Sequence, residues 1–109
     1  MNHGFQDAVS LEIARRVAAR LEAAPDLVEV ARSNLERWSQ MNTGAPSLLR
    51  CYSEWREILA GPIAEICRQL RVDSDEAQRL RQNSPFAGVL SAAEVWAIKR
   101  ELRHAATPA

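Results

Sequence analysis

The sequence has little from which an active site could be built. It contains two histidines, His3 and His104, both close to an end of the chain and both without an obvious acidic partner. A catalytic base must be held in position by a further group. The four glycines are isolated from one another, which excludes a glycine-rich phosphate loop. The sequence therefore predicts a protein that is not an enzyme.

The chain also lacks a pattern of metal ligands. Its two cysteines, Cys51 and Cys67, have no histidine near them to complete a zinc site. Glu54, Glu57 and Glu65 are not accompanied by the Glu-x-x-His pairs that a di-metal helical bundle needs. We expect two reduced, buried thiols and a solvated acidic helix face. No metal and no cofactor are predicted.

Long apolar runs are absent too, so no membrane-spanning segment is expected. The first ten residues do not have the basic and apolar regions of a secretory signal, which predicts a cytoplasmic protein. The 14 basic and 14 acidic residues balance, so the chain has no overall positive field to attract nucleic acid. A length of 109 residues with 47% hydrophobic residues fits one folded domain at 1–109.

Apolar residues recur at helical spacing in every long segment, and no segment alternates with period two. The sequence predicts an all-α fold, a compact bundle of five or six short helices. An N-terminal helical hairpin is expected at about 6–40 and a C-terminal helical unit at about 47–104. Ser47, Asp73 with Glu76, and Ser91 with Glu94 are expected to cap the starts of three helices.

Residues 63–82 have the spacing of a helix-turn-helix pair. The expected inner faces are Ile66, Cys67 and Leu70 in a first helix, and Ala77 and Leu80 in a second. Cys67 and Ala77 are small, and we expect them to lie opposite each other where the helices cross.

If this pair reads DNA, the contacts would come from Gln78, Arg79 and Arg81 on the outer face of the second helix. Two features favour a plain α-hairpin instead. Arg71 occupies the turn position where DNA-binding pairs usually have glycine. The second helix also opens with acidic residues, although phosphate contacts dominate affinity for DNA.

The last third of the chain carries candidate protein-binding residues. The connector at 83–90 holds three large apolar residues, and Trp96 lies off the apolar stripe of the final helix, at about 92–104. Arginine and tryptophan are enriched at binding hot spots. We therefore predict a protein-binding surface made of Phe86, Val89, Leu90, Trp96, Arg100 and Arg103. The alternative is that Trp96 packs beneath the connector.

Three segments in the second half carry a family resemblance. They read EWREIL at 54–59, GPIAEICRQL at 61–70 and DSDEAQRLRQNSPFAGVLS at 73–91. With the last helix, this layout resembles small bacterial proteins identified as antitoxins or as transcription-regulator partners of toxins. The resemblance implies a protein that covers the active site of a cognate toxin and binds its own operator. It leaves a homodimer open.

Two other functions remain open at this point. One is a helix-turn-helix transcription regulator that has no toxin partner, and the other is an accessory subunit of an enzyme. A toxin-like gene in the same operon would favour the antitoxin, and its absence would favour the alternatives.

Overall fold

The computed structural model describes residues 3–106, and this range contains six α-helices and no strand. The prediction of an all-α bundle is therefore confirmed. The helices are α1 (His3–Ala23), α2 (Val28–Met41), α3 (Pro46–Leu59), α4 (Ile63–Arg71), α5 (Asp75–Arg81) and α6 (Ala92–Ala106), with a single 3-10 turn, η1 (Pro25–Leu27), before α2. Within this range, no helix is both long and apolar enough to cross a membrane.

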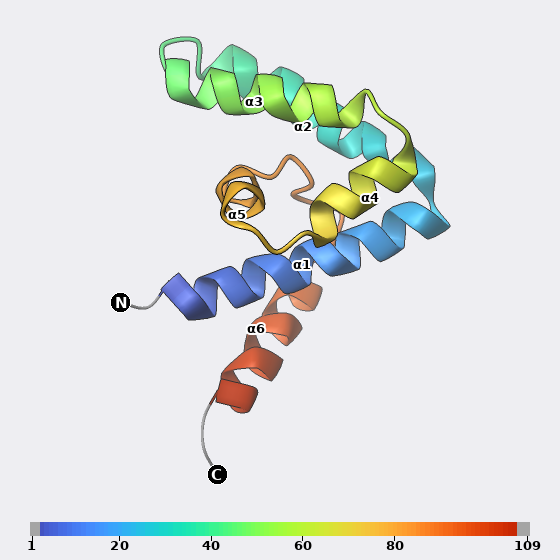
Figure 1. Cartoon of the computed structure of the whole chain (residues 1–109), viewed down its shortest axis with the longest axis vertical. Coiled ribbons are helices and arrows are strands. Elements are labelled where there is room, and N and C mark those ends of the chain that lie inside the picture. Colours follow the sequence, from blue (N-terminus) through green and yellow to red (C-terminus); the bar gives the residue numbers. More distant parts are fainter. Residues whose placement is uncertain (1–2, 107–109) are drawn as a thin grey trace.

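The helices are arranged around α1 (Figure 1). α2 and α3 form a pair at one end of the molecule, and α4 leads back from them to pack extensively along α1. α6 crosses α1 and extends away from the α2–α3 pair. The radius of gyration is 14.4 Å, above the roughly 13 Å expected of a compact chain of this length. The larger radius reflects α6, which extends away from the other helices and leaves part of its surface exposed to solvent.

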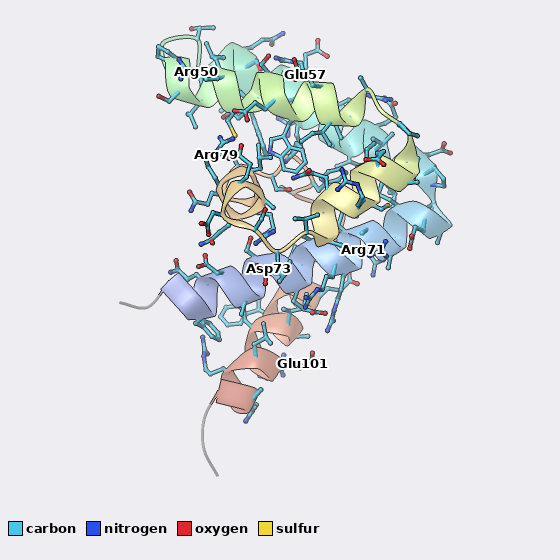
Figure 2. The ribbon with its side chains drawn as sticks, in the orientation of Figure 1. Arg50, Glu57, Arg71, Asp73, Arg79 and Glu101 are labelled. Carbon is cyan, nitrogen blue, oxygen red and sulfur yellow. The ribbon has the colours of Figure 1, made fainter. Side chains whose placement is uncertain are left out.

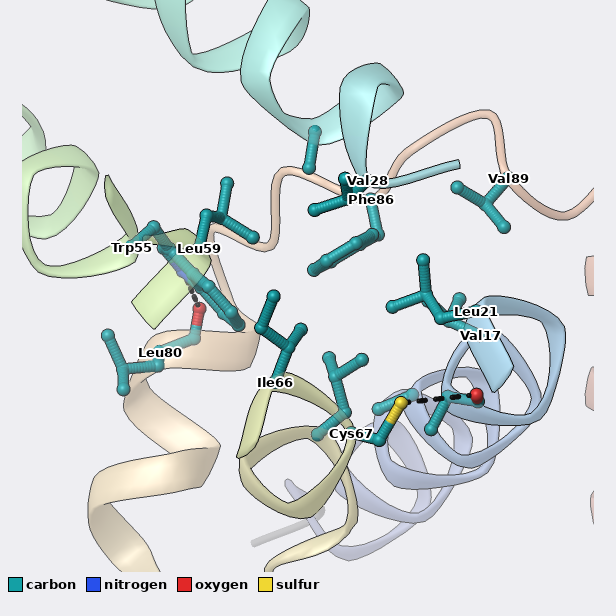
Figure 3. Close-up of a cluster of buried hydrophobic side chains, with 14 of the residues drawn as sticks. Val17, Leu21, Val28, Trp55, Leu59, Ile66, Cys67, Leu80, Phe86 and Val89 are labelled. Carbon is teal, nitrogen blue, oxygen red and sulfur yellow. Dashed lines mark hydrogen bonds between the residues drawn. The ribbon is translucent and has the colours of Figure 1, made fainter. Parts of the chain in front are cut away.

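Trp55 is the largest of the fully buried side chains in the core (Figure 3). Its indole Nε1–H donates to the carbonyl oxygen of Leu80 at 3.0 Å, and its ring meets Phe86 edge-on with 6.0 Å between centroids. Trp38 is half-buried and packs on Tyr52, with 6.0 Å between ring centroids. Trp55 therefore joins α3 to α5 and to the connector.

The close approach of α4 to α1 depends on small residues. Cys67 and Ala18 are both fully buried, and the Cys67 thiol donates to the Ala18 carbonyl oxygen at 3.4 Å. The sequence predicted that Cys67 would serve the contact with Ala77 in the next helix. The thiol instead faces α1, because α4 packs far more extensively on α1 than on α5.

One of the three predicted helix caps is confirmed. The backbone N–H of Glu94 donates to Ser91 Oγ at 3.1 Å, and the N–H of Ser91 donates to Glu94 Oε1 at 2.8 Å. This reciprocal pair is a capping box. It fixes the start of α6.

The other two caps were predicted one or two residues out of place. α5 is capped by Ser74, whose hydroxyl accepts from the N–H of Ala77 at 3.1 Å, and not by Asp73. α3 begins at Pro46, so Ser47 already lies inside the helix. Proline suits a first helical position because its missing N–H is not needed there.

The segment between α5 and α6, which we call the 82–91 connector, covers one side of the core. Phe86, Val89 and Leu90 are buried in the main apolar cluster, so their predicted place on a protein-binding surface is wrong. Asn34 of α2 holds the connector, with Nδ2 donating to the carbonyl oxygens of Pro85 at 2.8 Å and of Ala87 at 3.0 Å. These hydrogen bonds and the apolar bulk explain why the connector turns inward.

Candidate functional site

Arg79 of α5 is exposed and forms ion pairs with two glutamate carboxylates (Figure 2). Its Nη2 lies 2.6 Å from Glu54 Oε2 on α3, and it also pairs with Glu76. These hydrogen bonds, first from Glu76 and then from Glu54, raise the pKa of Arg79. A phosphate would have to compete with both glutamates for the Arg79 guanidinium.

Arg81 does not project outward as predicted. Only 7% of the residue is exposed, and Nη1 donates to the carbonyl oxygen of Val72 at 2.8 Å. The reason is helical geometry, because Arg81 follows the buried Ala77 by four residues and so lies on the same face. Gln78 is half-buried. The three residues predicted as DNA contacts therefore do not form one open surface.

The turn between α4 and α5 also differs from a tight glycine turn. Val72 and Ser74 are extended, and Gly88 is the one residue between 3 and 106 with positive φ. Arg71 makes two hydrogen bonds to the Glu22 carboxylate of α1, at 2.9 and 2.8 Å. Arg71 thus pairs α4 with α1, and Arg79 pairs α5 with α3. These contacts favour the plain α-hairpin alternative.

α6 is anchored to α1 along one face. Ile98 is fully buried, Arg16 Nη2 lies 3.0 Å from Glu101 Oε2, and Arg20 pairs with Glu94. These contacts orient the helix (Figure 2) and leave its other side to solvent.

The outer face of α6 carries an aromatic and basic cluster. Trp96 is 60% exposed, and Lys99 Nζ lies 5.6 Å from its ring centroid. Arg100 is exposed, and Arg103 reaches back to α1, where its Cζ lies 5.7 Å from the Phe5 ring centroid. These four residues follow one another at spacings of three, one and three, which places them on a single helical face. We call Trp96, Lys99, Arg100 and Arg103 the α6 surface.

Of the predicted protein-binding residues, the structure brings Trp96, Arg100 and Arg103 together in the α6 surface. The alternative that Trp96 packs beneath the connector does not hold, since its ring is largely exposed. Lys99 was missed. Its spacing of three from Trp96 was the signal that could have found it.

The ion pair between Arg20 of α1 and Glu94 of α6 predicts that the packing of α6 on α1 weakens in acid. Hydrogen bonds from Arg20 and then from the Ser91 backbone lower the pKa of Glu94 from its ordinary 4.5 to about 2. A lowered folded-state pKa contributes stability above pH 4.5, and this contribution is lost as the pH falls through about 2. The contribution is small, because solvent screens this exposed pair.

We therefore expect the difference in unfolding free energy between wild type and Glu94→Gln to be largest near pH 6 and to vanish near pH 2. Urea titrations across this range measure it. Glu57→Gln removes an exposed carboxylate from α3 and is the matched control. A wild-type-to-Glu94→Gln difference that stays constant with pH would show that the carboxylate charge does not hold α6.

Among the described residues, both cysteine thiols lie in surroundings that disfavour the thiolate. Burial raises the pKa of the Cys51 and Cys67 thiols, which keeps them protonated and weakly nucleophilic. His104 is exposed near the end of α6, and the side chain of His3 lies outside the described residues. In the part of the chain that the structure describes, no group of three His, Cys, Asp or Glu is placed to bind a metal.

Comparisons with protein-family models, with curated proteins and with solved structures found no match to this chain. The resemblance to antitoxins therefore stays a prediction from the sequence.

Proposed function

We propose that this chain is a non-enzymatic protein-binding protein that recognises its partner through the α6 surface. The observation that carries the proposal is Trp96, which is largely exposed on a helix that α1 already orients. A pre-oriented tryptophan loses little conformational freedom on binding. With Lys99, Arg100 and Arg103 around it, the complementary partner is an acidic protein with an apolar pocket for the indole.

The partner class that we propose is the toxin of a toxin–antitoxin pair. This choice rests on the resemblance of residues 54–91 and the last helix to antitoxins, whereas the α6 surface supports protein binding in general. Buried thiols with raised pKa values support a non-enzymatic role. We do not extend the proposal to operator binding, because Arg81 is buried and Arg79 is held by two glutamates.

The test is to express the product of the adjacent gene in the same operon, with and without this chain. We expect that product to inhibit growth, this chain to restore it, and the two proteins to form a complex. Trp96→Ala should weaken the complex by about 30-fold, since truncating a buried hot spot typically costs about 2 kcal/mol. Titration calorimetry of the purified pair measures the change.

Met41→Ala is the matched control, because Met41 is the other large apolar residue between 3 and 106 that is strongly exposed, at 72%. It lies at the end of α2, so its truncation should leave the affinity unchanged. A folded Trp96→Ala protein that binds as tightly as wild type would show that the α6 surface does not bind the partner. An adjacent gene product that neither inhibits growth nor binds would overturn the toxin partner.

A further inference from the structure

A groove runs along α1, between the 82–91 connector and the first turns of α6. Its volume is about 570 Å³, within the range of roughly 300–1,000 Å³ that is usual for small-molecule sites. Most of its wall is apolar and comes from Val9, Ile13, Val17, Phe86, Leu90 and Val95.

Arg81 is the charged residue in this wall that the fold buries. Its Nη1 donates to the Val72 carbonyl oxygen, but its buried Nε has no hydrogen-bond acceptor. Among residues 3–106, no carboxylate lies within 4 Å of its guanidinium. Buried charges are normally paired, so an unpaired guanidinium at an apolar groove indicates a missing anion.

The surrounding charges do not supply that anion. Burial lowers the pKa of Arg81 and outweighs the opposing influence of Asp73 and Asp7, while Arg15 lowers it further. Lys99 also lines the groove, but its Nζ lies against the Trp96 ring on the outer face of α6.

We propose that this groove binds a small amphipathic carboxylate, with its apolar body along α1 and its carboxylate on Arg81. Nε belongs to the side-on edge of the guanidinium, which matches the two oxygens of a carboxylate. A single buried cation suits a single negative charge. Nε is covered by neighbouring atoms, so the proposal requires the Arg81 side chain to turn toward the groove when the anion enters.

Octanoate is the probe, compared with octan-1-ol and octylammonium, which keep the chain and change the head group. We expect the Kd for octanoate to be at least tenfold lower than for octan-1-ol, with octylammonium weakest. In ¹⁵N-labelled protein, the Arg81 Nε–H resonance should shift with octanoate and not with octan-1-ol. This resonance reports directly on the group that the proposal invokes.

Two variants distinguish a loss of carboxylate recognition from a loss of the folded state. Arg81→Met keeps the length of the side chain without its charge, and should bind octanoate and octan-1-ol equally. Val95→Trp fills the groove from α6 and should abolish binding of both, even if Arg81→Met does not fold. Thermal unfolding checks that each variant is folded.

Equal affinities for octanoate and octan-1-ol in the wild type would overturn the proposal, as would unchanged octanoate binding in Val95→Trp. Sedimentation at increasing protein concentration tests the other occupant, a second copy of the chain. A dimer that Val95→Trp disrupts and that octanoate does not affect would assign the groove to self-association instead.

Discussion

Trp55→Ala should lower the free energy of unfolding by about 3–5 kcal/mol, the usual cost of truncating a large buried aromatic side chain. The residue is 1% exposed, and its indole N–H holds the Leu80 carbonyl oxygen at the end of α5. The substitution therefore leaves a cavity and also a buried carbonyl without its donor. Urea unfolding followed by circular dichroism measures the loss.

Trp96→Ala is the internal comparison, because the same substitution is made at an exposed tryptophan. Its stability should stay within about 0.5 kcal/mol of wild type, as is usual for surface substitutions. If the two variants lost similar stability, the separation between a core tryptophan and a surface tryptophan would be wrong.

Ile98→Ala should cost about 2–4 kcal/mol, the second largest effect that we expect. Ile98 is fully buried where α6 crosses α1, and the ion pairs around it are largely exposed. Exposed pairs contribute little, so the isoleucine supplies most of the docking energy. Hydrogen exchange should accelerate in α6 before it does in α3.

Arg100→Ala is the control for this helix, since it truncates an exposed residue two positions away. It should change neither the stability nor the exchange rates of α6. Protection of the α6 amides that is unaffected by Ile98→Ala would mean that other contacts hold the helix.

The sequence predicted the fold well because helical periodicity and the Ser91–Glu94 box are local signals. Arg81 was misplaced because its spacing of four from Ala77, which puts both residues on the buried face of α5, was overlooked. Asn34 was missed, although its spacing of three from the buried Ala31 indicated the same face. Its partners, the carbonyls of the connector, are some fifty residues away and have no local signature.

In the candidate site, too, residues with a local sequence signal could be predicted, and residues that depend on contacts between distant segments could not. Trp96 could be placed outside the core because one helix determines which of its residues share a stripe. Phe86 could not be placed, because whether a connector covers the core or faces a partner depends on contacts between distant segments. The groove beside Arg81 had no signal in the sequence, since it is formed by α1, α5, the connector and α6 together.

The inward position of the connector restricts how the protein can be dissected. A peptide that contained α4 and α5 alone would lack Trp55, Phe86 and Leu90, and would expose Ile66 and Leu80, which share a buried cluster with them. Such a peptide would present an apolar surface that the whole chain hides, and any adhesion to nucleic acid or protein would reflect that surface. The smallest fragment that preserves this core must extend from α1 beyond residue 90.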